Sequence, residues 1–509
     1  MVKNWIEVFR ETVKKNKSKV AVIHRENEIT FSELNEKALQ IAGIIKSKTA
    51  QSNRPIVVLL PKSIEAVYAD IGIMYSCNIF SNLDVKTPSE RLNNIVAAMH
   101  PIGIITTREE ENLLDIPSDM FVIYADDLEN SAYSEKLILA DIDRQIDTDP
   151  FCIINTSGST GTPKGVVLNH KSFFDFMEWA FATFDLEGND RIGSLSPIVF
   201  DIYDFELCFM MSKGATIVLL DASNAAFPAR LLQVLQKQKI TFLFWVPTIM
   251  VNIANMDLLS KIQLDSIRTI WFAGEVFPTK QFNYWRGKLT GTTFANLYGP
   301  IEITLDCIYY VADKMIAEDE PLPIGIPCRN TDILLLNDQN EICQDDEEGE
   351  ICVRGTSLAM GYYNNPEKTK AAFVQNPLNS SYPEIIYRTG DIGVRKSEDS
   401  LIYFRGRKDS LIKHMGYRIE LGEIEHILVN ELKVVKNCCV VYDFSKKQIV
   451  LYYEPLRFDK RQIQQKLMKV FPRYMIPTIW NQVEELPRNT NGKIDRLLLS
   501  QRVNEQEAE

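Results

Sequence analysis

The sequence has few of the residues that metal centres and disulfide frameworks need. Only five histidines occur in 509 residues, and none of the nine cysteines forms a C-x-x-C pair. A structural zinc site needs clustered Cys and His ligands, and disulfide frameworks are typical of small secreted domains. We therefore expect reduced cysteines in the core of a cytoplasmic protein.

Long apolar runs and an excess of positive charge are also missing. No stretch of about 18 consecutive apolar residues occurs, so we expect no transmembrane helix. The N-terminal segment is rich in lysine and has apolar residues at helical spacing, which favours a surface helix over a signal peptide. The net charge of −12 argues against nucleic acid or an anionic membrane as the main partner.

Short apolar strands alternate with amphipathic helices along most of the chain. "RPIVVLLP" (54–61) and "IGIITT" (102–107) have the pattern of buried strands, and "SIEAVYADIGIMYS" (63–76) has that of a helix. This alternation predicts an α/β fold with mixed sheets, and 509 residues are too many for one core. Because the later strands are short and separated by turns, we expect a large N-terminal domain over 1–406 and a small α+β domain over 407–509.

The segment "INTSGSTGTPKGVVLNH" (154–170) places small hydroxyl residues and glycines between two apolar stretches. Backbone N–H groups and hydroxyls with little side-chain bulk around them suit a polyphosphate, and Lys164 adds a positive charge. The segment is not the G-x-x-x-x-G-K-[ST] P-loop, because no hydroxyl residue follows Lys164. A flexible linker is the alternative interpretation, since Ser/Gly tracts often serve that purpose.

This loop and five further segments resemble those of adenylate-forming enzymes, the superfamily of acyl- and aryl-CoA synthetases, luciferases and nonribosomal-peptide adenylation domains. The segments follow the order found in that family and cover the chain nearly end to end. They are "TSGSTGTPKG" (156–165), "NLYGPIE" (296–302), "GEICVRGTSLAMGYYNNPEKT" (349–369), "YRTGD" (387–391), "GRKDSLIKHMGYRIELGEIE" (406–425) and "PRNTNGKID" (487–495). Within the superfamily the chain most resembles stand-alone amino-acid adenylation enzymes, above all D-alanine–carrier-protein ligases.

The resemblance implies that a carboxylate reacts with ATP to give an acyl-adenylate and pyrophosphate, with Mg²⁺ as the metal. Two anions meet at the α-phosphorus, so positioning and charge neutralisation account for most of the catalysis. The resemblance assigns Glu302 to Mg²⁺, Lys493 to the bridge between substrate carboxylate and phosphate, and Lys413 to a second half-reaction. The residues that it assigns to the nucleotide are Thr156, Ser157, Ser159, Thr160, Lys164, Asn296, Tyr298, Gly299, Asp391 and Arg407.

One residue departs from the family pattern inside a nucleotide segment. The family usually has threonine between the proline and the glutamate of "GPIE", and this chain has Ile301. The missing hydroxyl removes about one hydrogen bond to the adenylate phosphate, worth about 1 kcal/mol and up to roughly 3 kcal/mol with a charged acceptor. We therefore expect weaker handling of ATP rather than an inactive protein.

The segment "VFDIYDFEL" (199–207) resembles the start of the substrate pocket in amino-acid-activating members, where Asp201 binds the substrate ammonium. The alternative for Asp201 is a helix N-cap. By the same resemblance the specificity positions are Asp201, Ile202, Phe205, Phe244, Trp271, Ala273, Leu297, Leu305 and Asp306. Three large aromatic side chains leave little space, which predicts a small amino acid. Asp306 either faces the pocket and binds a second polar or cationic group, or faces outward.

The last expectation concerns the acceptor of the activated group. No "GG-x-S" phosphopantetheine site follows Lys493, so we expect a stand-alone ligase that serves a separate phosphopantetheinylated carrier protein. The resemblance implies that the small domain rotates at Asp409, which withdraws Lys493 and brings the "LIKHMGYR" hairpin to the active site. Two other functions remain open: an aryl- or acyl-CoA ligase, and a catalytically silent nucleotide-binding protein.

Overall fold

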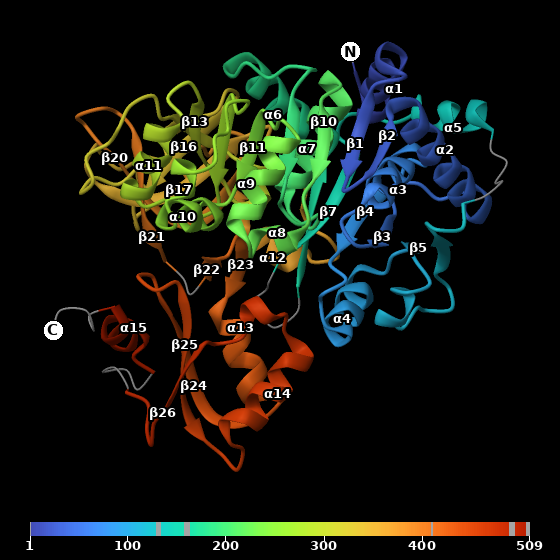
Figure 1. Ribbon diagram of the computed structural model, residues 1–509. Helices are drawn as coiled ribbons and strands as arrows, with labels where there is room; N and C mark the ends of the chain where they lie inside the picture. Colours follow the sequence, from blue (N-terminus) through green and yellow to red (C-terminus); the bar gives the residue numbers. More distant parts are fainter. Residues whose placement is uncertain (1, 129–133, 157–162, 409–410, 488–493, 505–509) are drawn as a thin grey trace.

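The computed structural model describes residues 2–128, 134–156, 163–408, 411–487 and 494–504. Figure 1 shows a large domain above a small C-terminal domain, coloured orange to red, with a hairpin at their junction. The expected α/β fold, with a large N-terminal domain and a smaller C-terminal one, is therefore confirmed. No helix in the described part of the chain is long and apolar enough to cross a membrane.

The larger of the two central sheets has nine strands and is mostly parallel. Its inner strands, such as "FLFW", are apolar on both faces because helices cover both sides of a parallel sheet. In order across the sheet the strands are β15 (Ile326–Pro327), β14 (Ile308–Val311), β13 (Thr293–Tyr298), β12 (Thr269–Ala273), β11 (Phe242–Trp245), β9 (Arg191–Ser194), β10 (Thr216–Leu219), β1 (Val20–His24) and β2 (Asn27–Thr30).

The second central sheet has seven strands. Its inner strands are parallel, and the antiparallel pair β7–β8 flanks the Ser/Thr/Gly segment. In order the strands are β18 (Gly361–Tyr362), β8 (Lys164–Asn169), β7 (Pro150–Thr156), β4 (Ile79–Leu83), β3 (Pro55–Leu59), β5 (Gly103–Thr106) and β6 (Phe121–Tyr124).

The helices of the large domain pack between and around these sheets. They are α1 (Trp5–Asn16), α2 (Phe31–Lys48), α3 (Ile64–Tyr75), α4 (Ser89–Met99), α5 (Glu135–Ile142), α6 (His170–Thr183), α7 (Asp201–Lys213), α8 (Ala222–Ala225), α9 (Pro228–Lys237), α10 (Pro247–Asn255) and α11 (Thr279–Lys288), with the short 3₁₀ helices η1 (Glu111–Leu113), η2 (Leu258–Ser260) and η3 (Ile301–Ile303).

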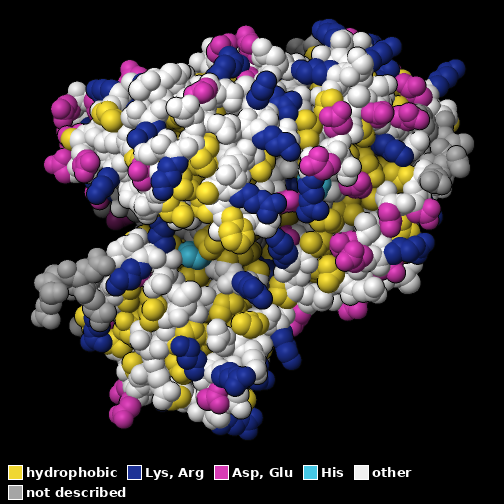
Figure 2. All heavy atoms as spheres, in the orientation of Figure 1, with side chains coloured by type: hydrophobic (Ala, Val, Ile, Leu, Met, Phe, Trp, Pro, Cys, Tyr) yellow, Lys and Arg dark blue, Asp and Glu magenta, His cyan; other side chains and the backbone are white. Residues whose placement is uncertain are grey.

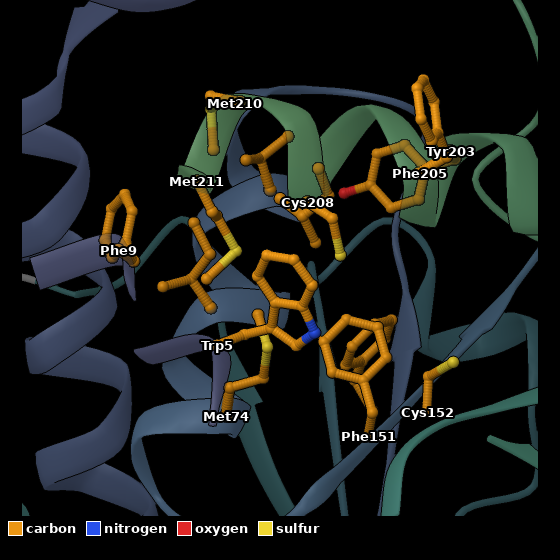
Figure 3. Close-up of a cluster of buried hydrophobic side chains, with 14 of the residues drawn as sticks. Trp5, Phe9, Met74, Phe151, Cys152, Tyr203, Phe205, Cys208, Met210 and Met211 are labelled. Atoms are coloured by element: carbon orange, nitrogen blue, oxygen red, sulfur yellow. The ribbon is translucent and has the colours of Figure 1, made fainter. Parts of the chain in front are cut away.

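Helix α7 is buried along most of its length. Its side chains join one core cluster with residues of both central sheets, such as Phe151 of β7 and Phe244 of β11. Figure 3 shows Cys208 and Met211 of α7 pointing toward Trp5 of α1. A helix that is apolar nearly all round belongs in the interior, so the start of α7 is held rigidly where the two sheets meet.

A third, antiparallel sheet completes the large domain. Helix α12 (Pro366–Ala372) lies beside this sheet. All nine cysteines of the protein are buried and free. The strands are β16 (Thr331–Leu336), β17 (Glu348–Gly355), β20 (Ile385–Arg395) and β19 (Phe373–Gln375), with β21 (Ile402–Arg407) paired to β20.

The small domain is α+β and has its own core. Its hydrophobic cluster is built from the hairpin, a three-stranded sheet and the helices that cover it. Its elements are the hairpin strands β22 (Leu411–His414) and β23 (Tyr417–Glu420), the sheet strands β24 (Val435–Asp443), β25 (Gln448–Pro455) and β26 (Ile479–Gln482), the helices α13 (Leu421–His426), α14 (Lys460–Val470) and α15 (Arg496–Asn504), the π-helix η4 (Ile427–Glu431) and the 3₁₀ helix η5 (Arg473–Met475).

Gly72 should be essential for the packing of α3 on α2. A Cβ atom at this position would lie 2.5 Å from the Ile41 Cβ and 2.8 Å from the Ala38 carbonyl oxygen. Overpacking typically costs about 1–3 kcal/mol, and the helix backbone cannot yield easily, so we expect Gly72→Ala to cost about 3 kcal/mol of unfolding free energy. Denaturant unfolding and the melting temperature measure this loss.

Gly291→Ala is the matched control, because no heavy atom lies within 4 Å of its added Cβ. We expect a change below about 0.5 kcal/mol there. Equal stability of the two variants would mean that α2 and α3 can move apart without loss, which contradicts close packing at Gly72.

Candidate functional site

A cavity of about 140 Å³ lies between the large domain and the hairpin formed by residues 411–420. Phe244 and Ala273 border it from the carboxyl ends of parallel strands, the usual location of ligands in open α/β sheets. Lys413 borders it from the hairpin. Figure 2 shows hydrophobic and basic side chains at this junction of the two domains.

Asp201 is the first residue of α7 and lines the cavity. The N-cap of the helix is Phe200, so Asp201 is not the cap, although its Oδ1 accepts a hydrogen bond from the Ile202 N–H at 2.9 Å. Burial raises the pKa of Asp201 to about 6, and Lys413 opposes this shift. An ammonium group that entered the cavity would stabilise the ionised form of Asp201.

Asp306 also lines the cavity, which answers the question that the sequence left open. The two residues before it, Thr304 and Leu305, have φ values of 55° and 65°. Left-handed backbone at such residues is costly and occurs mostly at ligand sites. Burial, and then the charge of Asp201, raise the pKa of Asp306. The cavity therefore presents two carboxyl groups to a ligand.

The three aromatic side chains predicted around the substrate do not all reach the cavity. Phe244 lines it, whereas Phe205 and Trp271 are fully buried behind Phe244, with ring centroids 5.6 and 5.5 Å from that of Phe244. The expectation that all three border the substrate is therefore corrected, because edge-to-face packing keeps two of them in the core. Leu297 is buried as well, while Ile202, Ala273 and Leu305 border the cavity.

Three of the residues predicted to bind the nucleotide form one hydrogen-bonded group. The Tyr298 hydroxyl donates to Oδ2 of Asp391, and Nη1 of Arg407 donates to Oδ1 of the same carboxylate, each at 2.5 Å. Nearby, the side-chain amide of Asn296 donates to the Pro323 carbonyl at 2.8 Å. Both oxygens of Asp391 thus already accept hydrogen bonds from the protein, and a ribose would replace those donors.

The remaining nucleotide candidates within the described residues are Thr156, Lys164 and Gly299. Thr156 and Gly299 line the cavity, and the Lys164 ammonium lies 5.0 Å from the centroid of the Tyr362 ring. A Cβ at Gly299 would lie 2.3 Å from the Leu305 carbonyl oxygen, so only glycine fits. Five predicted residues lie outside the described part of the chain: Ser157, Ser159, Thr160, Asp409 and Lys493.

Glu302 is fully buried and ionised. Its Oε1 accepts a hydrogen bond from the Tyr362 hydroxyl at 2.8 Å, and its Oε2 accepts one from Nη1 of Arg418 at 2.6 Å. Burial alone would raise the pKa of Glu302, but Arg418, Tyr362 and Lys164 lower it to about 2. A permanently charged oxygen ligand fits Mg²⁺, which binds one or two carboxylates together with phosphate oxygens.

The hairpin is held in the site by contacts of its turn and of its second strand. The Gly416 N–H donates to Oε1 of Glu275 at 3.0 Å, and the ring of Tyr417 lies edge-on to that of Phe200 at 4.9 Å. Gly416 has φ of +83°, and a Cβ there would lie 2.9 Å from Val246. Burial lowers the pKa of Lys413, while Asp391 and Asp306 oppose the shift.

The residues that flank Lys493 lie on another face of the small domain. The Asp495 N–H donates to the Pro487 carbonyl at 2.8 Å, and Ile494 packs on a cluster formed with β24 and β25. Neither Pro487 nor Ile494 borders the cavity. In this structure the hairpin, rather than the segments on either side of Lys493, faces the site.

Sequence reasoning missed several residues that complete the site. Arg418 and Tyr362 hold Glu302, and Glu275 holds the hairpin. Arg418 gave one signal that could have been used, namely a positive charge in the middle of the short strand "YRIE". Tyr362 and Glu275 lie in segments whose pattern does not reveal which residue they contact.

The family model described as "AMP-binding enzyme" matches residues 9–363. Zwittermicin A synthase ZmaJ of Bacillus cereus is 28% identical over 504 residues, which cover 97% of this chain and 94% of that protein. Gramicidin S synthase 2 of Brevibacillus brevis is 29% identical over 504 residues, and the match covers 97% of this chain but only 11% of that protein. The chain thus spans a small part of some relatives and nearly all of another.

Solved structures show the same fold at low sequence identity. Holo-PA1221, an NRPS protein containing adenylation and PCP domains, has a TM-score of 0.82 at 21% identity, covering 98% of this chain and 84% of that one. Amide bond synthetase McbA from Marinactinospora thermotolerans has a TM-score of 0.85 at 16% identity, covering 98% and 100%. o-Succinylbenzoate CoA synthetase from Bacillus subtilis has a TM-score of 0.82 at 20% identity, covering 98% of each chain.

Replacing Asp201 should change how the stability of the protein depends on pH. The folded-state pKa of about 6 exceeds the ordinary value of 3.8, so the folded protein binds this proton more tightly than the unfolded chain. The contribution to stability is complete below pH 3.8 and is lost as the pH rises through about 6. The loss is at most about 3 kcal/mol. The melting temperature of Asp201→Asn relative to wild type should therefore rise over this range.

The exposed Asp119 provides the control, since Asp119→Asn should show no pH-dependent difference from wild type. Lys413, Glu302 and Asp306 also face Asp201. Because the charge of Asp201 raises the pKa of Asp306, the difference in melting temperature between Asp201→Asn and wild type reports these two interacting carboxyl groups together. Parallel pH profiles for all three proteins would show that Asp201 is ionised normally in the folded state.

Proposed function

Because the chain belongs to the family of AMP-binding enzymes, we propose that it activates a small, D-alanine-like amino acid with ATP and passes it to a carrier protein. The amino-acid carboxylate would attack the α-phosphorus of ATP, forming an aminoacyl-adenylate and releasing pyrophosphate. A phosphopantetheine thiolate of a separate carrier would then attack the carbonyl carbon and release AMP. The carboxylate of Asp201 at the start of α7, in a cavity bordered by the hairpin, is the observation that supports this proposal most.

The groups around the cavity support a specific set of contacts with the two substrates. Asp201 would bind the substrate ammonium, and burial behind the hairpin strengthens such a pair. Asp391 would accept hydrogen bonds from the ribose hydroxyls in place of those from Tyr298 and Arg407. Glu302 would hold Mg²⁺, which supplies positive charge beside the triphosphate when bound. Thr156 and Lys164 would contact the phosphates from β7 and β8.

The arrangement of the small domain supports a role in the second half-reaction. Lys413 and Gly416 border the cavity, while the residues flanking Lys493 do not. This is the arrangement expected when the thiol attacks, after adenylate formation, the step in which Lys493 acts, is complete. The proposal thus has three parts: the reaction, the separate carrier protein and the small size of the amino acid.

Two alternative functions remain, and an experiment can distinguish them from the proposed one. The fold likeness to o-succinylbenzoate CoA synthetase leaves a CoA ligase possible, although likeness at 20% identity concerns the fold alone. A silent nucleotide-binding protein is supported by Ile301, which lines the cavity where a hydroxyl would face the phosphate. The two carboxyl groups at Asp201 and Asp306, whose ionised forms an ammonium group would stabilise, favour an amino acid over an aryl or fatty acid.

Lys493 should serve adenylate formation only. Lys493→Ala should lower amino-acid-dependent pyrophosphate exchange by at least about a hundredfold, because it removes a charge that stabilises the transition state. Transfer of the aminoacyl group from preformed adenylate to a thiol should survive. The exposed Lys469 of α14 is the control, and Lys469→Ala should leave both half-reactions unchanged. Equal damage to both half-reactions in Lys493→Ala would contradict the assignment.

The cavity should prefer a small amino acid. Alanine, glycine or serine should support faster pyrophosphate exchange than phenylalanine, leucine or lysine, because Phe244 restricts the cavity and overpacking costs about 1–3 kcal/mol, roughly ten- to a hundredfold in selectivity. Phe244→Ala should admit larger side chains. Trp271→Ala, which removes a ring behind Phe244, should do so less and destabilise the fold more.

The same panel distinguishes the alternatives. A preference for a basic amino acid would make Asp306 the main specificity contact and would refute the steric argument. Exchange with aryl or fatty acids alone would favour the CoA ligase. No exchange with any acid would favour the silent protein.

A further inference from the structure

We propose that Arg418 and Mg²⁺ compete for the carboxylate of Glu302, so that the hairpin enters the site only when the metal has left. The inference rests on the proposed role of Glu302 as the metal ligand. It adds that the metal leaves before the hairpin docks. It makes Arg418 a positioning residue that couples loss of the metal to docking of the small domain.

The contact that carries the proposal is short and buried. Nη1 of Arg418 lies 2.6 Å from Oε2 of Glu302, and the two side chains are 12% and 0% exposed. Oε1 of Glu302 accepts from the Tyr362 hydroxyl at 2.8 Å. Both carboxylate oxygens are therefore engaged, and a metal ion at Oε2 would occupy the position of the guanidinium group.

Charge balance makes the two occupants alternatives. A buried carboxylate without a cation is strongly unfavourable, so Glu302 needs a positive partner in every state. A guanidinium and a divalent ion at the same carboxylate would repel each other in a medium that screens charge weakly. Because Lys164 also lies close to Glu302, a second added cation there would be more unfavourable still.

The hairpin itself indicates that Arg418 belongs in this position. Lys413 and Arg418 are directly opposite each other in the β22–β23 pairing, so two cations share one face of the hairpin. Like charges at opposed positions destabilise a strand pair in isolation. Docking resolves this, since Arg418 reaches Glu302 while Lys413 faces Asp391 and Asp306. The two positive charges of the hairpin are therefore compensated only when the hairpin is docked in the site.

Linkage gives the consequence of the competition. If the metal and the docked hairpin exclude each other at Glu302, metal binding weakens docking, and docking weakens metal binding by the same factor. Pyrophosphate that leaves with its metal would thus vacate Glu302 for Arg418. The protein would then adopt the arrangement for thiol attack only after adenylate formation is complete.

Mn²⁺ binding tests the competition in the full-length protein. The protein is saturated with an ATP analogue that cannot be cleaved between the α- and β-phosphates, and only Mn²⁺ is varied. Free Mn²⁺ is followed by electron paramagnetic resonance, and amide hydrogen exchange of residues 411–420 reports docking of the hairpin. In wild type, Mn²⁺ should accelerate this exchange about tenfold or more. Arg418→Gln should bind Mn²⁺ about tenfold more tightly and lose the response of the hairpin to Mn²⁺.

Two further variants keep the result interpretable. Arg91 and Glu423 form a second ion pair between the domains, 2.6 Å long and 10% and 0% exposed, in which Glu302 takes no part. Arg91→Gln should accelerate hairpin exchange in every condition and keep the response to Mn²⁺. Arg418→Lys retains a cation and should restore part of that response if Arg418→Gln is folded poorly.

The outcomes separate the two ideas. An unchanged response to Mn²⁺ in Arg418→Gln would overturn the competition and leave the metal role of Glu302 intact. Failure of the wild-type protein to bind Mn²⁺ with the nucleotide would overturn that metal role, and the competition with it. Loss of the response in Arg91→Gln as well would show that any loosening of the domains has this effect, which also refutes a specific role for Arg418.

Discussion

Burial of carboxylates in one place sets the charge balance of the whole active centre. Removing an ionised carboxylate from water costs several kcal/mol unless a cation or donors compensate. Glu302 and Asp391 each have an arginine, Arg418 and Arg407, within hydrogen-bonding distance. The two carboxyls of the cavity lack such a close partner among the described residues, and their pKa values are raised by burial. Glu302 can thus exchange its arginine for a metal cation, and Asp391 can exchange its donors for ribose hydroxyls. Asp201 and Asp306 instead favour a ligand that brings positive charge.

The scaffold fixes these groups on one side of the cavity only. Asp201 begins a helix buried between the two central sheets, so its position depends on core packing that a ligand cannot displace. Asp306 follows two left-handed residues, and the preceding turn at Gly299 leaves no room for a side chain. The opposite wall is the hairpin, held by Glu275 and one aromatic contact. One rigid wall and one removable wall suit a site that must admit different partners in turn.

The sequence was sufficient for the fold class, because strand and helix periods alternate clearly and the motif segments follow a known order. The sequence was less informative about the direction in which individual side chains point. Whether Asp306 faces inward depends on the backbone at Thr304 and Leu305, neither of which is a residue type that favours positive φ. Phe205 and Trp271 were placed beside the substrate because the resemblance gives a residue's position along an element, whereas its depth depends on packing partners far away in the chain. The Arg418–Glu302 pair joins residues 116 apart in the sequence, and no local pattern reports such a contact.

The way the domains meet explains how one wall can be removable. Within the described residues, the hydrophobic clusters of the small domain contain only residues after 411, and those of the large domain contain only residues before 405. The junction instead consists of ion pairs, Arg91 with Glu423 and Arg418 with Glu302, together with ring contacts such as that between Phe200 and Tyr417. Separation of the domains therefore exposes little apolar core, and its free energy depends on whether each buried charge finds another partner. At Glu302 the proposed second partner is the metal ion, which would make this carboxylate the point where the chemistry of the site controls the position of the domain.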